Sequence, residues 1–435
     1  MAQREIRMKV TITPPHRLEG GVALPGDKSI SHRALLLNAI ARGKARLRNL
    51  GPGADVLSTI TCLRALGVNI ELEGGEAVVT GVGGELVEPQ DVLQAGNSAT
   101  TLRLLAGLLA ARPFLSLITG DASLRSRPMD RVIVPLRQMG ASIWGRGGDS
   151  LPPLAIRGGK LKGIHYRLPL PSAQVKSALL LAGLFAQGGM EIVEPVPSRD
   201  HTERLLLRMG APISKEGDRI SLEPLASPLP ALDMEVPGDI SSAAFFLAAG
   251  ALHPQASLRL GGVGVNPTRT GFLEVMRAMG ASFRLEAPRE EGGEPVADLE
   301  AETSHLEGVE VGGEIIPRLI DEVPVLVVVA TQARGRTIIR GAGELRVKES
   351  DRIAFTTREL NRMGAGIEEL PDGFIIQGPV PLKGAEVDSR GDHRLAMALA
   401  VAGLVARGET TILRAEAADV SYPGFFQTLQ HLGKS

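Results

Sequence analysis

The sequence has little of several residue types, and each shortage excludes a class of protein. One of the 435 residues is a cysteine, Cys62, so an internal disulfide and a cysteine-rich zinc site are excluded. Aromatic residues make up 3% of the chain, which leaves few side chains to stack on single-stranded nucleic acid. We therefore expect an aliphatic core, with Cys62 as a buried thiol within it.

The chain also lacks an excess of charge of either sign and any long apolar run. Lys and Arg number 48 and Asp and Glu number 49, a balance that disfavours a nucleic-acid partner. The apolar stretches Ala243–Leu252 and Val323–Ala330 are too short to cross a bilayer. Residues 1–10 hold no apolar run of the kind found in secretory signals. We therefore expect a cytoplasmic protein with no membrane partner.

What the sequence does contain is a repeat. The phrase LRALGVNI recurs as LRQMGASI, LLRMGAPI, MRAMGASF, LNRMGAGI and LQHLGKS. Consecutive glycines of these phrases are 69 to 84 residues apart, which is typical of one structural unit used six times. The apolar spacing before each glycine, as in Val132–Met139, predicts an amphipathic helix that the glycine ends. The glycines are Gly67, Gly140, Gly210, Gly280, Gly364 and Gly433.

Each unit also holds a helix that is apolar almost all round, such as SALLLAGLFAQG, followed by a short strand such as MEIVEP. A helix of this kind has to be buried, so other elements must surround it. We therefore expect an α/β protein whose six units form two groups of three around shared cores. The expected domains are residues 27–235, and residues 236–435 together with 1–26. The N-terminal strand before Pro25 should pair with the second group, which gives two crossings between the domains.

A polar cluster stands before each buried helix: GDKSISHR, AGNSATT, PSAQVKS, PGDISS, LIDE and SRGDHR. Ser, Asp and Asn at these places are typical helix caps, and capping alone is enough for PGDISS. Capping does not account for Lys28, Arg33, Gln174, His393 and Arg394. If the helix ends converge, their positive dipole ends and these cations form an anion site.

Two charged motifs, GVALPGDKS and RVKESDR, suggest a functional site but also have a simpler structural interpretation. GVALPGDKS is similar to a phosphate-binding P-loop, but Asp27 separates the glycine from Lys28, so a nucleotide site of that type is not expected. RVKESDR is the densest charged run, and a solvated helix face is its plain interpretation. On a helix, Lys348, Glu349 and Arg352 would share one face. There Glu349 would be an acid–base group or part of a salt bridge.

Eight motifs, in order over about residues 10 to 428, resemble those of the 5-enolpyruvylshikimate-3-phosphate (EPSP) synthase family. The resemblance implies the two-domain enolpyruvyl transferase fold, an α/β fold with six βαβαββ repeats grouped three per domain around buried helices. It also implies an active site in the cleft between the domains. The motifs are LPGDKSISHRALLL, GNSATTLRLLAG, RPMDR, SAQVKSALLLAGL, SRDHTERLL, IDEVPVL, RVKESDR and GDHRLAMALA.

The family reaction moves the enolpyruvyl group of phosphoenolpyruvate to the 5-hydroxyl of shikimate 3-phosphate and releases phosphate. It is a step of the shikimate pathway towards chorismate and the aromatic amino acids, and it needs no metal or organic cofactor. Both substrates carry a phosphate and a carboxylate, so several cations must face one place. Arginine suits both groups because its guanidinium donates two parallel hydrogen bonds.

The resemblance assigns the site residue by residue. The expected catalytic residues are Asp321 as base for the 5-hydroxyl, Glu349 as proton donor to C3, and Lys28 and His393 as assisting groups. For Asp321 the alternative is a helix cap, and for Ser198 it is a bond within its own loop. Shikimate 3-phosphate should contact Lys28, Ser29, Arg33, Ser172, Ala173, Gln174, Ser198, Asp321 and Lys348. Phosphoenolpyruvate should contact Lys28, Asn97, Ala99, Arg127, Gln174, Arg352 and Arg394.

The motifs depart from the common family pattern at Ala99, where many relatives have glycine. An added methyl group should crowd the phosphoenolpyruvate pocket, which the inhibitor glyphosate also occupies. We therefore expect reduced glyphosate sensitivity, as in the tolerant branch of the family. No lysine is carried over in DVSYPGFF, where some relatives have one just before the last helix.

Two alternative functions fit the sequence less well. UDP-N-acetylglucosamine enolpyruvyl transferase usually has a cysteine before the Arg-Pro pair, where this chain reads GDASLRSRP, and Lys-Asn in place of Lys28-Ser29. A non-catalytic anion-binding module is disfavoured because Asp321, Glu349 and Arg394 are all present. We expect a monomer.

Overall fold

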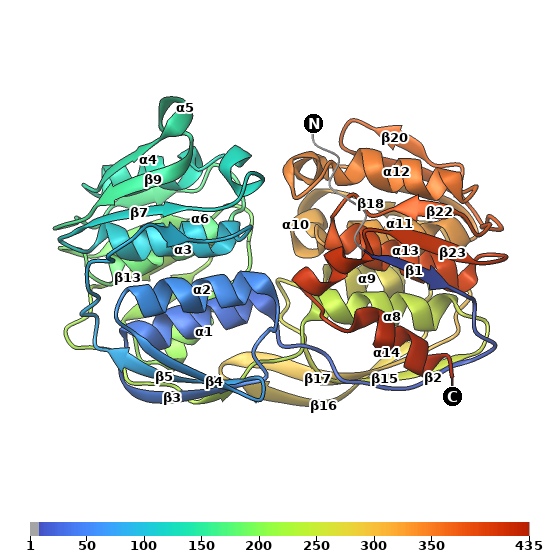
Figure 1. Ribbon diagram of the computed structural model, residues 1–435, viewed down its shortest axis with the longest axis horizontal. Coiled ribbons are helices and arrows are strands. Elements are labelled where there is room, and N and C mark those ends of the chain that lie inside the picture. The colour runs from blue at the N-terminus through green and yellow to red at the C-terminus, as the bar shows by residue number, and fades with distance from the viewer. Residues whose placement is uncertain (1–7, 435) are drawn as a thin grey trace. The chain divides into compact units, whose positions relative to one another are not determined.

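The computed structural model describes residues 8–434, which fold into two compact units (Figure 1). The N-terminal unit consists of Gly26–Pro237 and the short segment Glu290–Glu294. Among the described residues, the C-terminal unit consists of 8–25, Gly238–Arg289 and 295–434. The sequence predicted that the chain passes between the units twice, near residues 26 and 236. The structure adds a short segment, Glu290–Glu294, that belongs to the N-terminal unit although the residues on both sides of it belong to the C-terminal unit.

The N-terminal unit contains three four-stranded sheets with one pattern. Each sheet has one parallel pair of strands, and its other pairings are antiparallel. In two sheets the parallel strands stand before and after one buried helix, whereas in the third they are β14 and β3, which lie far apart in the chain. The strand orders are β14-β3-β5-β4, β6-β7-β9-β8 and β10-β11-β13-β12. The strands are β3 (Arg42–Arg48), β4 (Asn69–Glu73), β5 (Glu76–Val82), β6 (Leu93–Gln94), β7 (Leu115–Thr119), β8 (Ser142–Gly145), β9 (Leu151–Arg157), β10 (His165–Arg167), β11 (Met190–Val193), β12 (Ile213–Glu216), β13 (Arg219–Leu222) and β14 (Met234–Glu235).

Three apolar helices of this unit are buried, and three amphipathic helices cover them. Cys62, on the amphipathic helix Ala54–Ala65, is 1% exposed, and burial raises its pKa to about 12. It is therefore the buried core thiol that the sequence predicted. The buried helices are α1 (Lys28–Ile40), α3 (Ala99–Ala110) and α6 (Ala173–Gly183). The amphipathic helices are α2 (Ala54–Ala65), α4 (Asp130–Gln138) and α7 (His201–Arg208), and short turns are η1 (Leu124–Ser126) and α5 (Arg146–Asp149).

The C-terminal unit also contains three sheets, and two of them include a strand from the beginning of the chain, β1 or β2. β1 pairs antiparallel with β23 and β2 pairs parallel with β15, so both N-terminal strands belong to sheets of this unit. The strand orders are β16-β17-β15-β2, β18-β19-β21-β20 and β1-β23-β22. The strands are β1 (Lys9–Ile12), β2 (Leu18–Val22), β15 (Ala256–Gly264), β16 (Phe283–Glu291), β17 (Glu294–Glu302), β18 (Glu310–Val311), β19 (Gly335–Ile339), β20 (Glu368–Leu370), β21 (Gly373–Gly378), β22 (Glu386–Asp388) and β23 (Thr410–Leu413).

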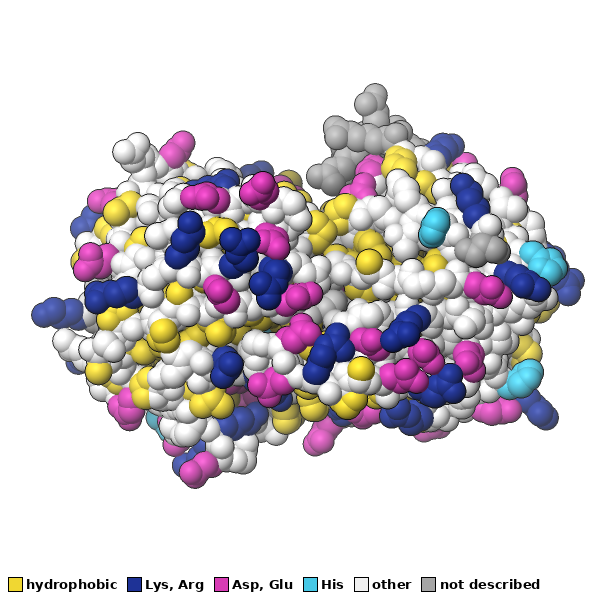
Figure 2. Space-filling model, turned by 90° about the horizontal axis from the view of Figure 1, so that it is seen from below, with side chains coloured by type: hydrophobic (Ala, Val, Ile, Leu, Met, Phe, Trp, Pro, Cys, Tyr) yellow, Lys and Arg dark blue, Asp and Glu magenta, His cyan; other side chains and the backbone are white. Residues whose placement is uncertain are grey.

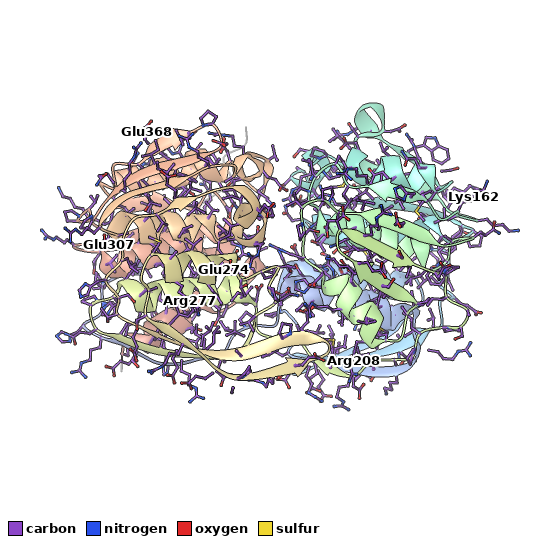
Figure 3. All side chains as sticks on the ribbon, turned by 180° about the vertical axis from the view of Figure 1, so that it is seen from behind. Lys162, Arg208, Glu274, Arg277, Glu307 and Glu368 are labelled. Atoms are coloured by element: carbon purple, nitrogen blue, oxygen red, sulfur yellow. The ribbon has the colours of Figure 1, made fainter. Side chains whose placement is uncertain are left out.

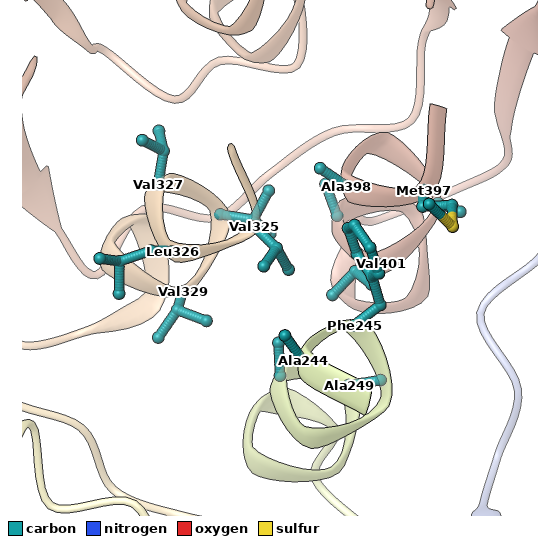
Figure 4. Packing of buried hydrophobic residues seen from close by; sticks show 14 of the residues in the cluster. Ala244, Phe245, Ala249, Val325, Leu326, Val327, Val329, Met397, Ala398 and Val401 are labelled. Atoms are coloured by element: carbon teal, nitrogen blue, oxygen red, sulfur yellow. The ribbon is translucent and has the colours of Figure 1, made fainter. Parts of the chain in front are cut away.

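The core of the C-terminal unit is the packing of three buried helices, shown from close by in Figure 4. Phe246, Leu326 and Val401 on these helices are fully buried, and burial of such a side chain contributes about 1.5–3 kcal/mol to stability. The buried helices are α8 (Ile240–Leu252), α11 (Val323–Gln332) and α13 (His393–Val405). The remaining helices are α9 (Gly271–Ala278), α10 (Ile316–Leu319), α12 (Arg352–Arg362) and α14 (Phe425–Leu432), with turns η2 (Gly313–Ile315), η3 (Gly343–Val347) and η4 (Ala415–Val420).

The second helix of each repeat is amphipathic, as predicted. On α9, Phe272 and Met276 are fully buried, whereas Glu274 and Arg277 are exposed and labelled in Figure 3. This division matches the spacing of apolar residues in the sequence. The six βαβαββ repeats and the α/β fold class are thereby confirmed.

Five of the six repeat glycines end their helices in the left-handed conformation, at φ of 77° to 104°. Glycine adopts this conformation without the steric cost that a Cβ would add. Gly433 differs from the prediction, because its φ is −89°. A Cβ at this position would lie 2.9 Å from Cβ of Pro15, so close packing takes the place of backbone conformation as the reason for glycine.

The surface carries both charges together. On the face shown in Figure 2, Lys and Arg side chains are interspersed with Asp and Glu. This mixture agrees with the formal net charge of −1. Among residues 8–434, no helix is long and apolar enough to cross a membrane.

Candidate active site

The polar clusters before the buried helices cap most of them. Asp27 accepts a hydrogen bond from the backbone N of Ile30 at 2.9 Å, and Ser98 accepts one from Thr101 at 3.1 Å. Ser172, Asp239 and Asp392 cap α6, α8 and α13 in the same way. Asp321 is not a cap, because Glu322 occupies the position before α11. Capping therefore accounts for part of each cluster and leaves its cations and Asp321 for other chemistry.

The first two turns of α1 contain three of the predicted residues, Lys28, Ser29 and Arg33. Lys28 Nζ lies 3.0 Å from Asp55 Oδ2, and Arg33 Nη1 donates to the backbone oxygen of Ser29 at 2.8 Å. Arg33 is 3% exposed, and its Nε and Nη2 donate to hydroxyls of α7 and α6 at 2.8 Å each. Burial lowers the pKa of Arg33 to about 10, so it remains a cation at neutral pH. Arg199, which sequence reasoning did not select, donates to Ser29 Oγ at 3.5 Å.

The start of α6 places Gln174 between two neighbours. Its Oε1 accepts a hydrogen bond from Arg103 Nη1, and its Nε2 donates to Thr100 Oγ1 at 2.9 Å. Ser172 and Ala173 lie just before it, at the cap and the first residue of α6. The amide of Gln174 is therefore held in one orientation, and its neighbour Arg103 was not among the predicted site residues.

Ser198 bonds within its own loop. Its backbone N donates to Glu194 Oε1 at 3.0 Å, and its hydroxyl donates to the same oxygen. Phosphate and carboxylate oxygens require donors, and in this arrangement the one hydroxyl proton of Ser198 is already used. In this structure Ser198 therefore makes the bond within its own loop that was the alternative to substrate binding.

Glu194 in turn belongs to a buried charge cluster that sequence reasoning missed. Lys176 is fully buried on α6, and its Nζ lies 2.8 Å from Glu194 and 2.7 Å from Glu203. A lysine inside the otherwise apolar helix SAQVKSALLL was the available signal.

Three residues predicted to contact phosphoenolpyruvate gather at the start of α3. Arg127 Nη2 donates to Asn97 Oδ1 at 2.7 Å, and Asn97 Nδ2 donates to Asp121 Oδ2 at 2.8 Å. Ala99 is the first residue of α3 and is 8% exposed. These contacts fix the Asn97 amide so that its oxygen faces Arg127. Asp121 was not predicted, although it lies six residues before Arg127.

A chain of buried hydroxyls links α1 to this end of α3. His32 Nδ1 lies 2.7 Å from Thr59 Oγ1, which lies 2.7 Å from Thr101 Oγ1, and Thr101 donates to Ser98 Oγ at 2.8 Å. His32 is fully buried, and burial lowers its pKa from 6.5 to about 3. The imidazole is therefore neutral at physiological pH.

The lowered pKa of His32 predicts that the folded protein loses stability in acid. The unfolded chain protonates His32 below pH 6.5, whereas the folded chain does so only near pH 3. The free energy of unfolding should therefore fall between these values, by about 1.4 kcal/mol per pH unit from this group. The variant His32→Asn does not titrate, so its unfolding free energy should fall less steeply from pH 6.5 to pH 4.5. Urea unfolding at several pH values measures both slopes, and equal slopes would contradict the assignment.

In the C-terminal unit, one buried guanidinium joins three carboxylates. Arg352 is 1% exposed, and its Nε lies 2.9 Å from Asp392 Oδ2. Its Nη2 lies 2.7 Å from Glu349 Oε2, and its Nη1 lies 3.5 Å from Asp321 Oδ1. Both predicted acid–base residues thus meet at one predicted binding residue. Asp392, assigned from the sequence only as part of a capping cluster, is the third partner.

The local structure around this cluster differs from the prediction. Lys348–Asp351 are not helical, because η3 ends at Val347 and α12 begins at Arg352. The reason is that Asp351 caps α12 by accepting from the backbone N of Ala354 at 3.0 Å. Glu349 lies before the capping residue Asp351, and Arg352 is the first residue of α12. Their ion pair therefore joins the preceding loop to the helix and does not lie along one helix face.

Charge balance keeps Arg352 and Asp392 ionised. Burial alone would lower the pKa of Arg352, but the charges of Asp392, Glu349 and Asp321 outweigh it and raise the pKa. Burial opposes ionisation of Asp392, yet Arg352 and His393 hold its pKa below the ordinary value. Arg352 and Asp392 are therefore a preorganised pair of opposite charges beside Asp321 and Glu349.

The other predicted residues of this unit lie at the ends of η3 and α13. Lys348 Nζ is 3.4 Å from Glu344 Oε1 at the surface. His393 and Arg394 are the first residues of α13 and are 3% and 5% exposed. Among residues 8–434, no group of three His, Cys, Asp or Glu side chains is placed to hold a metal ion.

Comparison with known proteins decides the family. Residues 12–429 match the family described as EPSP synthase (3-phosphoshikimate 1-carboxyvinyltransferase). The chain belongs to the EPSP synthase family. Like the enzymes of this family, it transfers the enolpyruvyl group of phosphoenolpyruvate to shikimate 3-phosphate in the shikimate pathway, and phosphate is released. The activity predicted from the motifs is thereby confirmed.

Individual EPSP synthases are similar over nearly their whole length. The 3-phosphoshikimate 1-carboxyvinyltransferases of Desulforudis audaxviator and Bacillus cereus (strain ATCC 10987 / NRS 248) are each 53% identical and cover 98% of this chain and 99% of their own. The structure of EPSP synthase from Acinetobacter baumannii superposes with a TM-score of 0.88 at 43% identity, and 98% of each chain is covered. The two-domain enolpyruvyl transferase fold is confirmed by this similarity.

Proposed function

We propose that the residues assigned from the motifs carry this reaction, with Asp321 and Glu349 exchanging protons with the substrates. The observation that carries the proposal is the meeting of both carboxylates at the buried guanidinium of Arg352. In this proposal shikimate 3-phosphate binds Lys28, Ser29, Arg33, Ser172, Ala173, Gln174, Ser198, Asp321 and Lys348. Ser198 can donate to the substrate only when its hydroxyl releases Glu194. Phosphoenolpyruvate binds Lys28, Asn97, Ala99, Arg127, Gln174, Arg352 and Arg394.

The proposed chemistry is addition followed by elimination. Asp321 accepts the proton of the 5-hydroxyl as its oxygen attacks C2 of phosphoenolpyruvate, and Glu349 donates a proton to C3. In the second step C3 returns a proton to the Glu349 carboxylate, the C–H electron pair forms the C2–C3 double bond, the C2–O bond to phosphate breaks, and phosphate leaves with the electron pair of that bond. Lys28 and His393 assist by balancing charge. General acid–base action of this kind typically contributes about 10²- to 10⁴-fold.

The proposed binding groups belong to both units. Lys28, Gln174 and Arg127 belong to the N-terminal unit, whereas Lys348 and Arg394 belong to the C-terminal unit. The proposal therefore requires both sets to reach the same pair of substrates, in the cleft that the family resemblance implies. Exclusion of water around them would strengthen every charge interaction in the site.

A pair of matched variants tests the assignment of substrates. Arg127→Gln should raise KM for phosphoenolpyruvate, and Lys348→Gln should raise KM for shikimate 3-phosphate. A hydrogen bond to a charged group contributes about 1.5–3 kcal/mol, which is about 10- to 100-fold in affinity. The other substrate's KM should change by less than about threefold in each case. Arg336→Gln, at an exposed position of β19, is the control, and KM changes that are equal for both substrates would refute the division.

Ala99 should lower sensitivity to glyphosate. Ala99 is the first residue of α3 and follows Asn97 by two residues, and we assign the Asn97–Arg127 pair to phosphoenolpyruvate. Ala99→Gly removes the methyl group, so the inhibition constant for glyphosate should fall. Inhibition titrations against phosphoenolpyruvate measure it, and an unchanged constant would show that Ala99 does not crowd the inhibitor.

The remaining expectations belong to the same proposal. They are a monomer, a reaction without metal or organic cofactor, and a cytoplasmic location. Sedimentation equilibrium tests the first, and full activity after exhaustive chelation tests the absence of a metal requirement.

A further inference from the structure

Asp321 is followed directly by a second carboxylate with different surroundings. Glu322 lies in the turn between α10 and α11 and is 1% exposed, whereas the side chain of Asp321 is 17% exposed. Glu322 precedes α11, yet its side chain does not cap that helix. A buried carboxylate needs a hydrogen bond or a cation, because isolated burial of its charge is costly. Its partners must therefore come from elsewhere in the unit.

Those partners form a chain from a second buried arginine. Glu322 Oε1 accepts a hydrogen bond from Ser241 Oγ, and Ser241 Oγ accepts one from Arg269 Nη2 at 2.7 Å. Arg269 is 2% exposed and also lies 3.5 Å from Asp239 Oδ1. Asp239 accepts from the backbone N of Ser241 at 2.8 Å, which fixes Ser241 at the start of α8.

The two adjacent carboxylates are thus tied to different buried guanidinium groups. Asp321 lies 3.5 Å from Arg352, and Glu322 is linked through Ser241 to Arg269. One peptide bond joins the two residues, so a shift of Glu322 moves Asp321 relative to Arg352. Displacement of a reacting group by about 1 Å can lower the rate about 100-fold.

We propose that Glu322 is a positioning residue for the reaction, held by Ser241 and Arg269, and that it fixes Asp321 for removal of the substrate hydroxyl proton. The inference rests on the proposed role of Asp321 as base. It assigns to the IDEVP motif two carboxylates with separate tasks. Asp321 exchanges the proton, and Glu322 fixes the turn that carries it.

Variants of Glu322 and Ser241 test this role in the full-length enzyme. Glu322→Ala and Ser241→Ala each break the chain, and each should lower kcat about 10- to 100-fold. The dissociation constant for shikimate 3-phosphate, measured by calorimetry, should change by less than about threefold, because every proposed ligand except Asp321 keeps its place. Glu322→Gln keeps an oxygen that accepts from Ser241, so it should retain most of the kcat that Glu322→Ala loses.

Controls separate positioning from folding. Ser242→Ala removes a hydroxyl at the next position of α8, where the side chain is as deeply buried but outside the chain to Glu322, so it should leave kcat unchanged. A merely structural role predicts a lower melting temperature with normal kcat per folded enzyme. That result, or equal kcat losses in Glu322→Gln and Glu322→Ala, would overturn the inference.

Asp321→Asn distinguishes this inference from the function on which it rests. If Asp321→Asn lowers kcat while Glu322→Ala and Ser241→Ala leave it normal, the positioning role fails and the base remains. If Asp321→Asn keeps normal kcat, the base assignment itself fails, and Glu322 has no base to position. Should Glu322→Ala not fold, Ser241→Ala and Glu322→Gln still decide the matter.

Discussion

Replacing Asp321 by asparagine should lower kcat by about 10²- to 10⁴-fold. Asparagine has nearly the same shape but cannot accept the proton of the 5-hydroxyl. It also loses the ion pair with Arg352 Nη1, which is long at 3.5 Å, so folding should change little. Steady-state phosphate release gives kcat, and the melting temperature checks the fold.

The matched control for this variant is Glu368→Gln. Glu368 is an exposed carboxylate on β20 of the same unit and is labelled in Figure 3. The same chemical change there should leave kcat within about twofold, since surface substitutions have small effects. An Asp321→Asn enzyme with more than a tenth of the normal kcat would mean that another group accepts the proton.

Replacing Arg352 by methionine should have the largest effect on stability. It leaves Asp392, which is fully buried, and Glu349 without their shared cation. Removal of one member of a buried ion pair typically costs about 3–5 kcal/mol. Urea unfolding at pH 7 should show this loss, and turnover should fall because a proposed phosphoenolpyruvate ligand is gone.

The pH dependence of this loss gives a sharper check. In the native protein Arg352 and His393 lower the pKa of Asp392, so that stabilisation is present at neutral pH and is lost in acid. Without Arg352, burial should raise the carboxyl pKa, and protonation then relieves the unpaired charge. The variant's deficit should therefore be smaller at pH 4 than at pH 7. Arg336→Met, on the exposed side of β19, should show little loss at either pH, and a pH-independent deficit for Arg352→Met would contradict the explanation.

The repeated architecture could be predicted from the sequence because it depends on local patterns. Apolar helices such as Val323–Gln332 and the glycine-ended amphipathic helices follow from periodicity alone. β14 could not be predicted, because the two residues Met234–Glu235 carry no pattern, and their pairing with β3 is decided by distant contacts. That Glu290–Glu294 belongs to the N-terminal unit could not be predicted either, because it too depends on contacts with residues far away in the chain.

The site could be predicted as a set of residues but not as a set of partners. The motifs selected Asp321, Glu349 and Arg352, and the structure brings them together. Asp55 and Asp121 pair with predicted residues that lie 24 or more positions away in the chain, a relation that spacing does not encode. The assumed helix over Lys348–Asp351 was wrong, because capping by Asp351 was overlooked. The substrate contacts themselves stay predictions.

The central claim is enolpyruvyl transfer to shikimate 3-phosphate through Asp321 and Glu349. Phosphate release from phosphoenolpyruvate, measured with shikimate 3-phosphate and again with UDP-N-acetylglucosamine as acceptor, tests it most directly. We predict release with shikimate 3-phosphate alone, and its loss in Asp321→Asn and Glu349→Gln. Release with UDP-N-acetylglucosamine, or undiminished release in both variants, would contradict the account.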